Sequence, residues 1–207
     1  MTGYTRAVAH DEHEHEHDHG HGPEEGEPTE AEARAEAERL IRKDVALAQI
    51  RQYGDPVLRM RAAEVNDVDD ELRRVSERMI DLMHDAEGVG LAATQVGILR
   101  RFFVCTLDGE DRVLVNPVVT PGDETEVDSE GCLSLGPVRL PVERAVRVRV
   151  EARDEHGEPV TLELEGIDAR VVQHELDHLD GTLIIDRTDP DARREALGLL
   201  RPRLVLA

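Results

Sequence analysis

The sequence has few basic residues, two cysteines and no long apolar run. Its 25 Lys and Arg residues stand against 46 Asp and Glu residues, which gives a formal net charge of −21. A surface that binds DNA, RNA phosphate or anionic lipid needs clustered Lys and Arg. Direct binding of nucleic acid or of a membrane surface is therefore not expected.

No run of about 18 apolar residues occurs, and no apolar segment follows a basic one at the N-terminus. We therefore expect neither a membrane span nor a secretory signal, and a cytoplasmic location. Cys105 and Cys132 are too few for a disulfide framework. Both are expected as thiols in a reducing compartment.

The first 44 residues differ from the rest in charge and histidine content. Residues 1–40 contain twelve acids and three arginines, a formal −9, and six of the ten histidines lie at 10–21. Such a segment cannot bury enough apolar surface to offset its ordering entropy. We predict a disordered tail over 1–44; weak metal gathering by its histidines is the alternative. Within it, Thr29 and Glu32 form a capping box that predicts an exposed, marginally stable helix.

Residues 45–207 are predicted to form one catalytic domain of the α+β class. Apolar spacing predicts a helix from Asp70 that ends by Gly88, and another over 167–179. Strands are expected over 101–107 and 112–120, and a hairpin joins 145–152 to 159–166. A last helix begins at Pro190, capped by Asp189. These elements suggest antiparallel or mixed sheets around a buried central helix that carries HExxH, with an N-terminal and a C-terminal helix.

The stretch QHELDHLDG, residues 173–181, carries the first sign of chemistry. His174 and His178 lie four residues apart, so a helix places both rings on one face, where they can share one metal ion. Glu175 between them is placed to move a proton to or from water. The alternative is a surface helix that contains HExxH by chance. The apolar residues around the motif favour a buried helix, in which unpaired charges would be costly.

A catalytic metal of this kind needs a third protein ligand and one open position. No histidine follows His178, and no second helix carries a suitable glutamate. Upstream, SEGCLSL places Cys132 after a glycine in a polar turn, and its thiolate would complete the set. The alternative for a cysteine is a small buried hydrophobe. That alternative fits Cys105 better, within the apolar run RFFVCTL.

The segment EGVGLAATQVG, residues 87–97, combines glycines and alanines with Gln95. The small residues form a strip of backbone that another chain can approach, and Gln95 offers an amide donor. A plain helix end followed by a turn is the alternative. A phosphate loop is rejected, because neither its Gly-Lys-Ser/Thr ending nor a βαβ unit is present.

The three segments, taken in order, resemble those of the peptide deformylase family. Its motifs G-x-G-x-A-A-x-Q, E-G-C-x-S and H-E-x-x-H correspond to GVGLAATQ, EGCLS and QHELDH, and RQYGDPVLR precedes them. The resemblance runs from about residue 45 to 186. It implies that Cys132, His174 and His178 bind one divalent metal ion. That ion is Fe(II) in many members, which makes it the first expectation, and Zn(II), Ni(II) or Co(II) in others.

The resemblance also implies a reaction and a substrate. A metal-activated water would attack the formyl group of an N-formylmethionyl peptide and release formate. Glu175 would transfer the proton, while the Gln95 amide and the Leu133 backbone N–H would stabilise the oxyanion. Nascent polypeptides are the expected partners, with a transient contact to the ribosome.

The peptide is expected to lie extended along the glycine-rich strip, as an added strand. The methionine pocket is assigned to the His174 ring and six further residues: Val89, Glu130, Leu133, Leu135, Ile167 and Val171. Gly90 and Arg139 are predicted to bind the substrate outside this pocket. Arg144 is expected to pair with Glu87. Gly136 and Pro137 depart from the family pattern, in which an aliphatic residue precedes proline, so the pocket rim is expected to differ.

Two other functions compete with this interpretation. One is an endopeptidase of the HExxH type, which an upstream cysteine ligand and the lean strip disfavour. The other is a metal-storage or metal-sensing protein in which the six tail histidines bind the metal. The sequence leaves open the native metal, the oligomeric state and the preference after the first residue.

Overall fold

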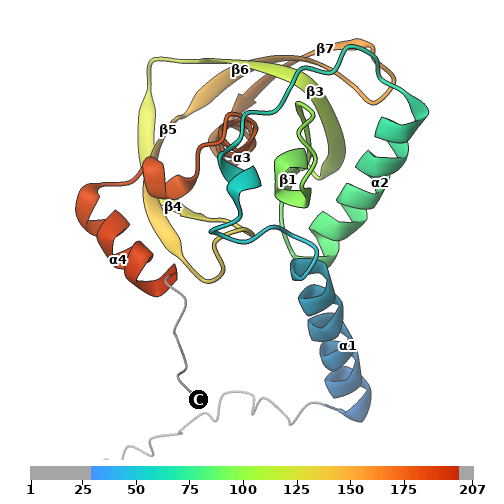
Figure 1. Cartoon of the computed structure of the whole chain (residues 1–207), viewed down its shortest axis with the longest axis vertical. Helices are drawn as coiled ribbons and strands as arrows, with labels where there is room; N and C mark the ends of the chain where they lie inside the picture. Colours follow the sequence, from blue (N-terminus) through green and yellow to red (C-terminus); the bar gives the residue numbers. More distant parts are fainter. Residues whose placement is uncertain (1–28, 201–207) are drawn as a thin grey trace, which may run out of the picture.

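The computed structural model describes residues 29–200, which form two antiparallel sheets and four α-helices (Figure 1). The predicted α+β class is confirmed. The histidine-rich run at 10–21 lies outside the described residues. No helix within 29–200 is both long enough and apolar enough to cross a membrane.

Five strands form the larger sheet in the order β1-β2-β3-β6-β7, and every neighbouring pair is antiparallel. Their bounds are Gly90–Ala92, Phe102–Leu107, Glu110–Pro121, Arg147–Arg153 and Pro159–Glu165. The predicted hairpin is confirmed, with Arg147 opposite Glu165. The alternation of apolar and charged residues explains why this segment forms a strand, because Val148 and Val150 are buried while Arg147 and Arg149 face solvent.

The smaller sheet pairs β4, Thr125–Gly131, with β5, Arg139–Ala145. The sequence predicted neither strand and placed a strand start at 145, where β5 in fact ends. The first five residues of β4 are all exposed, so β4 shows no alternation that could reveal it. This sheet positions Cys132, which directly follows β4.

Three of the four α-helices within 29–200 begin directly after a residue whose side chain caps them. α1, Glu30–Leu47, has the predicted capping box of Thr29 and Glu32, and it runs across the predicted domain boundary at 44/45. α2, Asp70–Asp85, starts after Asp69, whose carboxylate accepts the Leu72 N–H. α4, Pro190–Leu200, starts after Asp189, which accepts the N–H groups of Asp191 and Ala192.

α3, Gly166–Leu179, carries residues 174–178 and lies against the larger sheet. Val172 and Leu179 on α3 are fully buried in one core cluster with Phe103 and Leu114 of β2 and β3. Burying an aliphatic side chain of this size contributes about 1.5–3 kcal/mol. This packing fixes the helix, and with it the histidines on its other face.

Candidate metal centre and active site

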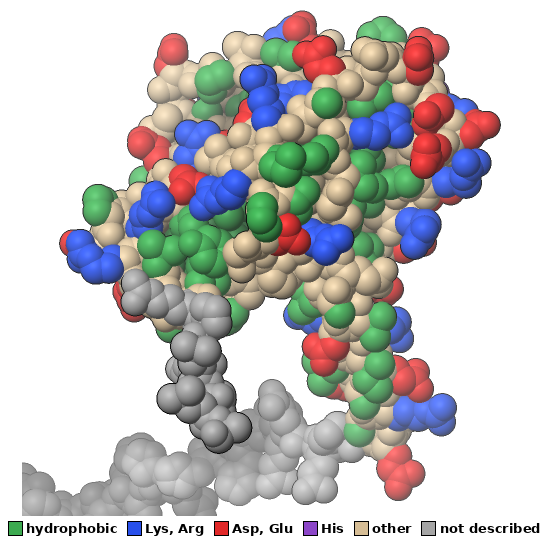
Figure 2. All heavy atoms as spheres, in the orientation of Figure 1, with side chains coloured by type: hydrophobic (Ala, Val, Ile, Leu, Met, Phe, Trp, Pro, Cys, Tyr) green, Lys and Arg blue, Asp and Glu red, His purple; other side chains and the backbone are tan. Residues whose placement is uncertain are grey.

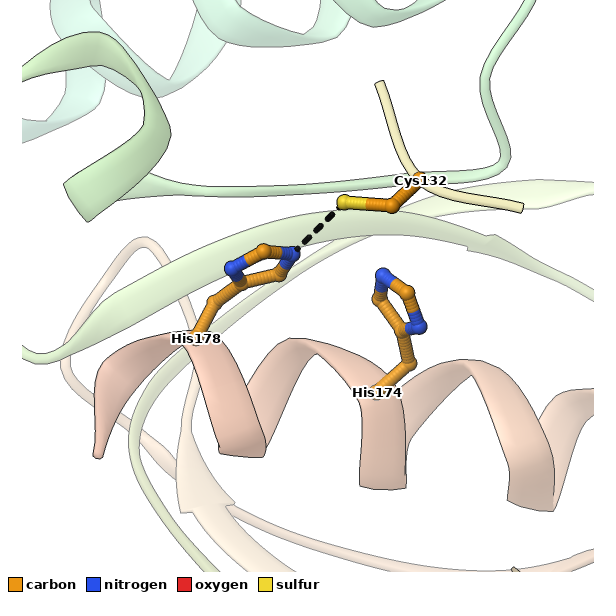
Figure 3. Close-up of side chains that lie close together, drawn as sticks. All are labelled: Cys132, His174 and His178. Carbon is orange, nitrogen blue, oxygen red and sulfur yellow. Dashed lines mark hydrogen bonds between the residues drawn. The ribbon is translucent and has the colours of Figure 1, made fainter. Parts of the chain in front are cut away.

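Cys132, His174 and His178 converge on one point (Figure 3). One ligand atom of each lies within 4.8 Å of the others, and the Cys132 sulfur is 3.2 Å from Nε2 of His178. Ligand atoms bound at 2.0–2.3 Å to one tetrahedral ion lie about 3–4 Å apart. One thiolate and two imidazoles with this spacing fit a divalent metal such as Zn(II) or Fe(II).

Glu130 holds the His174 ring in place. Its Oε2 lies 3.0 Å from Nδ1 of His174, and Arg144 binds both carboxylate oxygens at 2.9 and 3.0 Å. Arg170 adds a third contact, with Nη1 2.9 Å from Oε1. Burial raises the pKa of Glu130, but these partners outweigh it and hold the pKa at about 2. An ionised Glu130 accepts the Nδ1 proton, which leaves Nε2 of His174 free for a metal.

The predicted pair of Arg144 with Glu87 is wrong. Arg144 is buried and bonds Glu130 and the Asp177 carboxylate, with Nη1 2.6 Å from Oδ2. Glu87 instead meets two basic side chains of α1. The sequence does not show that Asp177 on α3 points towards Arg144 on β5, so this partner of Arg144 was not predicted. A buried arginine takes the carboxylates that are buried beside it, because unpaired charges there are costly.

Glu175 lies beside the metal ligands and is only 4% exposed. Burial raises the pKa of its carboxyl to about 7. Among residues 29–200, its Oε2 has no hydrogen-bond partner. A Cβ placed on Gly90 would lie 2.3 Å from Oε1 of Glu175, so only glycine fits there. The backbone of β1 therefore runs directly against this carboxylate.

Gln95 and Leu133 both lie close to Cys132. Gln95 is buried, and its Oε1 accepts the Ala92 N–H at 2.8 Å. Its Nε2 donates to Oγ of Ser134 at 3.1 Å and lies 3.9 Å from the Cys132 sulfur. These contacts fix the amide so that its NH₂ faces the metal ligands. Leu133 follows Cys132 in the turn after β4, where its carbonyl accepts from Gln52.

A cavity of about 800 Å³ opens beside this centre. Val89 and Ile167 stand at its mouth, 56% and 66% exposed. The lining includes most of the residues predicted from the sequence: Val89, Gly90, Gln95, Glu130, Cys132, Leu133, Arg139, Ile167, Val171, His174 and Glu175. The structure thus brings these residues together, although the first and the last, Val89 and Glu175, are 86 positions apart in the chain.

Leu135 is the exception among the predicted substrate-binding residues, because it does not line this cavity. It is 1% exposed and packs in the core cluster of Leu140 and Ile184. Its N–H bonds the Cys132 carbonyl, so the chain turns there and sends the side chain into the core. Gly136, Pro137 and Val138 line the cavity in its place. Gly136 and Pro137 are where the sequence departs from the family pattern.

The sequence did not predict that α1 would reach the cavity. Lys43 and Leu47 of α1 belong to the lining, as do Asp128 and Ser129 of β4. No local pattern in α1 shows this, because its charges look like those of any solvated helix face. Cys105 is fully buried, as expected for a core residue.

Comparison with known proteins gives the same family throughout. The model of the family described as "Polypeptide deformylase" matches residues 47–194. A peptide deformylase from Thermotoga sp. (strain RQ2) is 49% identical over 158 residues, which cover 76% of this chain and 94% of that protein. The peptide deformylase of Acidothermus cellulolyticus is 48% identical over 157 residues, 76% of this chain and 87% of its own.

Solved structures agree with the sequence matches. The crystal structure of peptide deformylase from Thermotoga maritima superposes with a TM-score of 0.66 at 49% identity, covering 68% of this chain and 97% of that one. That of Synechococcus elongatus, solved in complex with actinonin, gives a TM-score of 0.70 at 42% identity. It covers 73% of this chain and 84% of that chain.

Proposed function

Because the chain belongs to the peptide deformylase family, we propose that Cys132, His174 and His178 bind one divalent metal ion next to the formylated end of a peptide. The enzyme removes the formyl group from the N-terminal N-formylmethionine of newly made polypeptides and releases formate. The convergence of the three ligand atoms beside the buried carboxylate of Glu175, whose Oε2 has no hydrogen-bond partner among residues 29–200, carries the proposal.

The donor set and its spacing support a catalytic metal. A divalent ion held by one thiolate and two imidazoles supplies a Lewis acid and makes water nucleophilic at neutral pH. Fe(II) is the first candidate, with Zn(II) and Ni(II) as alternatives, since these donors suit all three. Glu130 contributes by keeping the His174 ring in the orientation that a ligand needs.

Glu175 acts as the proton carrier in this proposal. Its carboxylate takes the proton from the attacking water and passes it to the nitrogen of the departing methionine. The C–N bond of the formamide breaks, so the products are formate and a free amino terminus. Burial supports this role, because a pKa raised to about 7 lets the group both accept and donate near neutral pH.

Gln95 and Leu133 stabilise the developing negative charge. The NH₂ of Gln95 and the backbone N–H of Leu133 would donate to the formyl oxygen as it becomes an oxyanion. The fixed amide of Gln95 supports this assignment, because a donor that is already oriented needs no reorganisation during the reaction.

The rest of the cavity binds the peptide. Its backbone would lie extended beside Val89 and Gly90, as an added strand, which accounts for tolerance of varied sequence. Val89, Ile167 and Val171 with the ring of His174 supply apolar surface for methionine, and Arg139 stands at the rim. The exposure of Val89 and Ile167 supports this, because a bound side chain would cover them.

The wider setting follows from the reaction. We propose that residues 45–207 form the catalytic domain, with α3 as its central helix, and that the enzyme works in the cytoplasm on nascent chains. Contact with the ribosome would then be transient. The upstream cysteine ligand and the family match favour this function over an endopeptidase or a metal-storage protein.

Formate release tests the proposal directly. The full chain is loaded anaerobically with Fe(II), Zn(II) or Ni(II) in separate samples, and formate is measured with a formyl-Met peptide. We expect turnover in at least one sample, its loss in Cys132→Ser, and its retention in Cys105→Ala, which changes the other thiol. Absence of formate with every metal would overturn the proposal.

A further inference from the structure

Helix α1 reaches the substrate cavity although all of it except Leu47 precedes the region that the family model matches. The family match begins at residue 47, whereas α1 spans Glu30–Leu47. Lys43 and Leu47 nevertheless line the cavity. In Figure 1, α1 projects from the body beneath the end of α2, and Figure 2 shows acidic, basic and apolar side chains interspersed along it. Lys43 is therefore a residue of the cavity wall that lies before the matched region.

Ion pairs tie α1 to the edge of the cavity at Glu87. Nζ of Lys43 lies 2.5 Å from one carboxylate oxygen of Glu87, and Arg39 contacts the other. Glu87 has a φ of 59°, a left-handed conformation that costs a non-glycine residue about 1–2 kcal/mol. Glu87 lies two residues after the end of α2. The next N–H, that of Gly88, donates to the Met83 carbonyl at 2.8 Å and so closes the end of the helix.

The position of Glu87 along the peptide site follows from the chain direction. Gly90 packs on Glu175, so the formyl end of a substrate lies there, and Glu87 is three residues before Gly90. This step rests on the proposed function. Extended backbone advances about 3.3 Å per residue. Three extended residues span about 10 Å. A peptide that runs from the formyl site near Gly90 along the cavity towards Glu87 therefore brings its third residue to the end of the cavity that Lys43 lines.

The charges at this end of the cavity favour an acidic side chain. Two cations meet the single carboxylate of Glu87, and of these two only Lys43 lines the cavity. Arg39 also contacts Glu36, which does not line the cavity. Because Arg39 remains on Glu87, Lys43 can turn to a substrate without leaving that carboxylate unpaired. We propose that Lys43 determines specificity by favouring an acidic third residue in the substrate.

The expected preference is modest. Lys43 is about one third exposed, and partly exposed ion pairs contribute little. A gain in kcat/KM of about two- to fivefold corresponds to such a pair. Added salt should reduce the preference, because it screens charges at the surface.

Two peptides and three forms of the metal-loaded full chain test the inference. The peptides are formyl-Met-Ala-Glu-Ala-amide and formyl-Met-Ala-Lys-Ala-amide, and the quantity measured is the ratio of their kcat/KM values. Lys43→Glu is the test variant. Arg42→Glu is the matched control, because it makes the same charge change on the same helix. Arg42 contacts Asp85 and does not line the cavity.

We expect the wild-type enzyme and Arg42→Glu to prefer the Glu peptide, and Lys43→Glu to lose or reverse that preference. Lys43→Ala, expected to abolish it, serves if Lys43→Glu fails to fold. An unchanged ratio in the Lys43 variants, or an equal shift in Arg42→Glu, would overturn the inference and leave the proposed function standing. No formate from either peptide with wild-type enzyme would overturn both.

Discussion

At the scale of single residues, Glu175 is the side chain on which the proposed reaction depends most. Its Oε2 has no partner within the described chain, and burial disfavours its charge. Glu175→Gln keeps the shape but cannot carry a proton. We expect kcat to fall by about 10²- to 10⁴-fold, the usual contribution of general acid and base catalysis. Steady-state formate release measures this, and metal analysis should show the ion retained. A variant with more than a tenth of the wild-type kcat would contradict the role.

Gln95 is the second side chain with a specific role. Gln95→Ala should lower kcat by about 10²- to 10³-fold, because one donor to the oxyanion is lost. Ser134→Ala is the matched control, since it removes one of the two hydrogen bonds that orient the Gln95 amide but keeps the amide group itself. Rates and urea unfolding are measured together. A Gln95→Ala variant that folds normally and keeps more than a tenth of the wild-type kcat would contradict the role of the amide as a donor to the oxyanion.

At the scale of elements, the contacts among β4, β5 and α3 position the metal ligands. Arg170 on α3 bonds Glu130, the Val142 carbonyl and the Glu126 carbonyl. Arg170→Met should loosen Glu130, and with it the ring of His174. We expect metal affinity to fall by about 10- to 100-fold, as for other residues that support ligands. Competition with a chromogenic chelator measures the dissociation constant.

Arg187→Met controls for the loss of an ion pair in the same cluster, although the Arg187 side chain is about half exposed. Arg187 bonds Asp177 and has no contact with Glu130. Its substitution should change the dissociation constant much less than Arg170→Met does. Equal effects of the two variants, or no effect of Arg170→Met, would mean that Glu130 is held without Arg170.

A separate set of contacts joins the 3₁₀ segments Pro56–Arg59 and Ile184–Asp186 to α4. Asp186 contacts Arg59 and Arg193 and accepts the Leu183 N–H at 3.0 Å. Burial raises the pKa of Asp186, but these hydrogen bonds and charges outweigh it and keep the pKa below its ordinary 3.8. A depressed folded-state pKa means that the carboxylate stabilises the fold above pH 3.8. That contribution is lost as pH falls through the folded-state value.

Asp186→Asn should therefore lower the free energy of unfolding by about 1 kcal/mol at pH 7. The difference from wild type should shrink as pH is lowered below 3.8. Urea unfolding at a series of pH values measures it. Asp191→Asn, which alters an exposed pair with Arg194, should have almost no effect. A difference that grows in acid would contradict this account.

Local patterns were enough to predict some elements and not others. The spacing of His174 and His178 and the caps at Thr29 and Asp189 carry their own information, so those helices were predicted. β4 could not be, because its exposed residues do not alternate. The partners of Arg144 depend on which charges the fold buries together, and no local pattern encodes that.

At the scale of the whole molecule, a family domain is extended by a helix that borders its substrate site. The match over 47–194 accounts for the sheets and the metal ligands. The sequence resemblance identified the motifs because they lie within this shared region. It could not show what α1 does, because α1 precedes the shared region and contacts the cavity through residues without a motif.

The central claim is that one sulfur and two imidazole nitrogens bind a single ion. X-ray absorption spectroscopy of the full chain, loaded with one equivalent of Zn(II), tests this most directly. We expect one sulfur at about 2.3 Å and two nitrogens at about 2.0–2.1 Å. The sulfur should disappear in Cys132→Ser and persist in Cys105→Ala. A spectrum of wild-type protein without sulfur, or one that loses sulfur only in Cys105→Ala, would contradict the account.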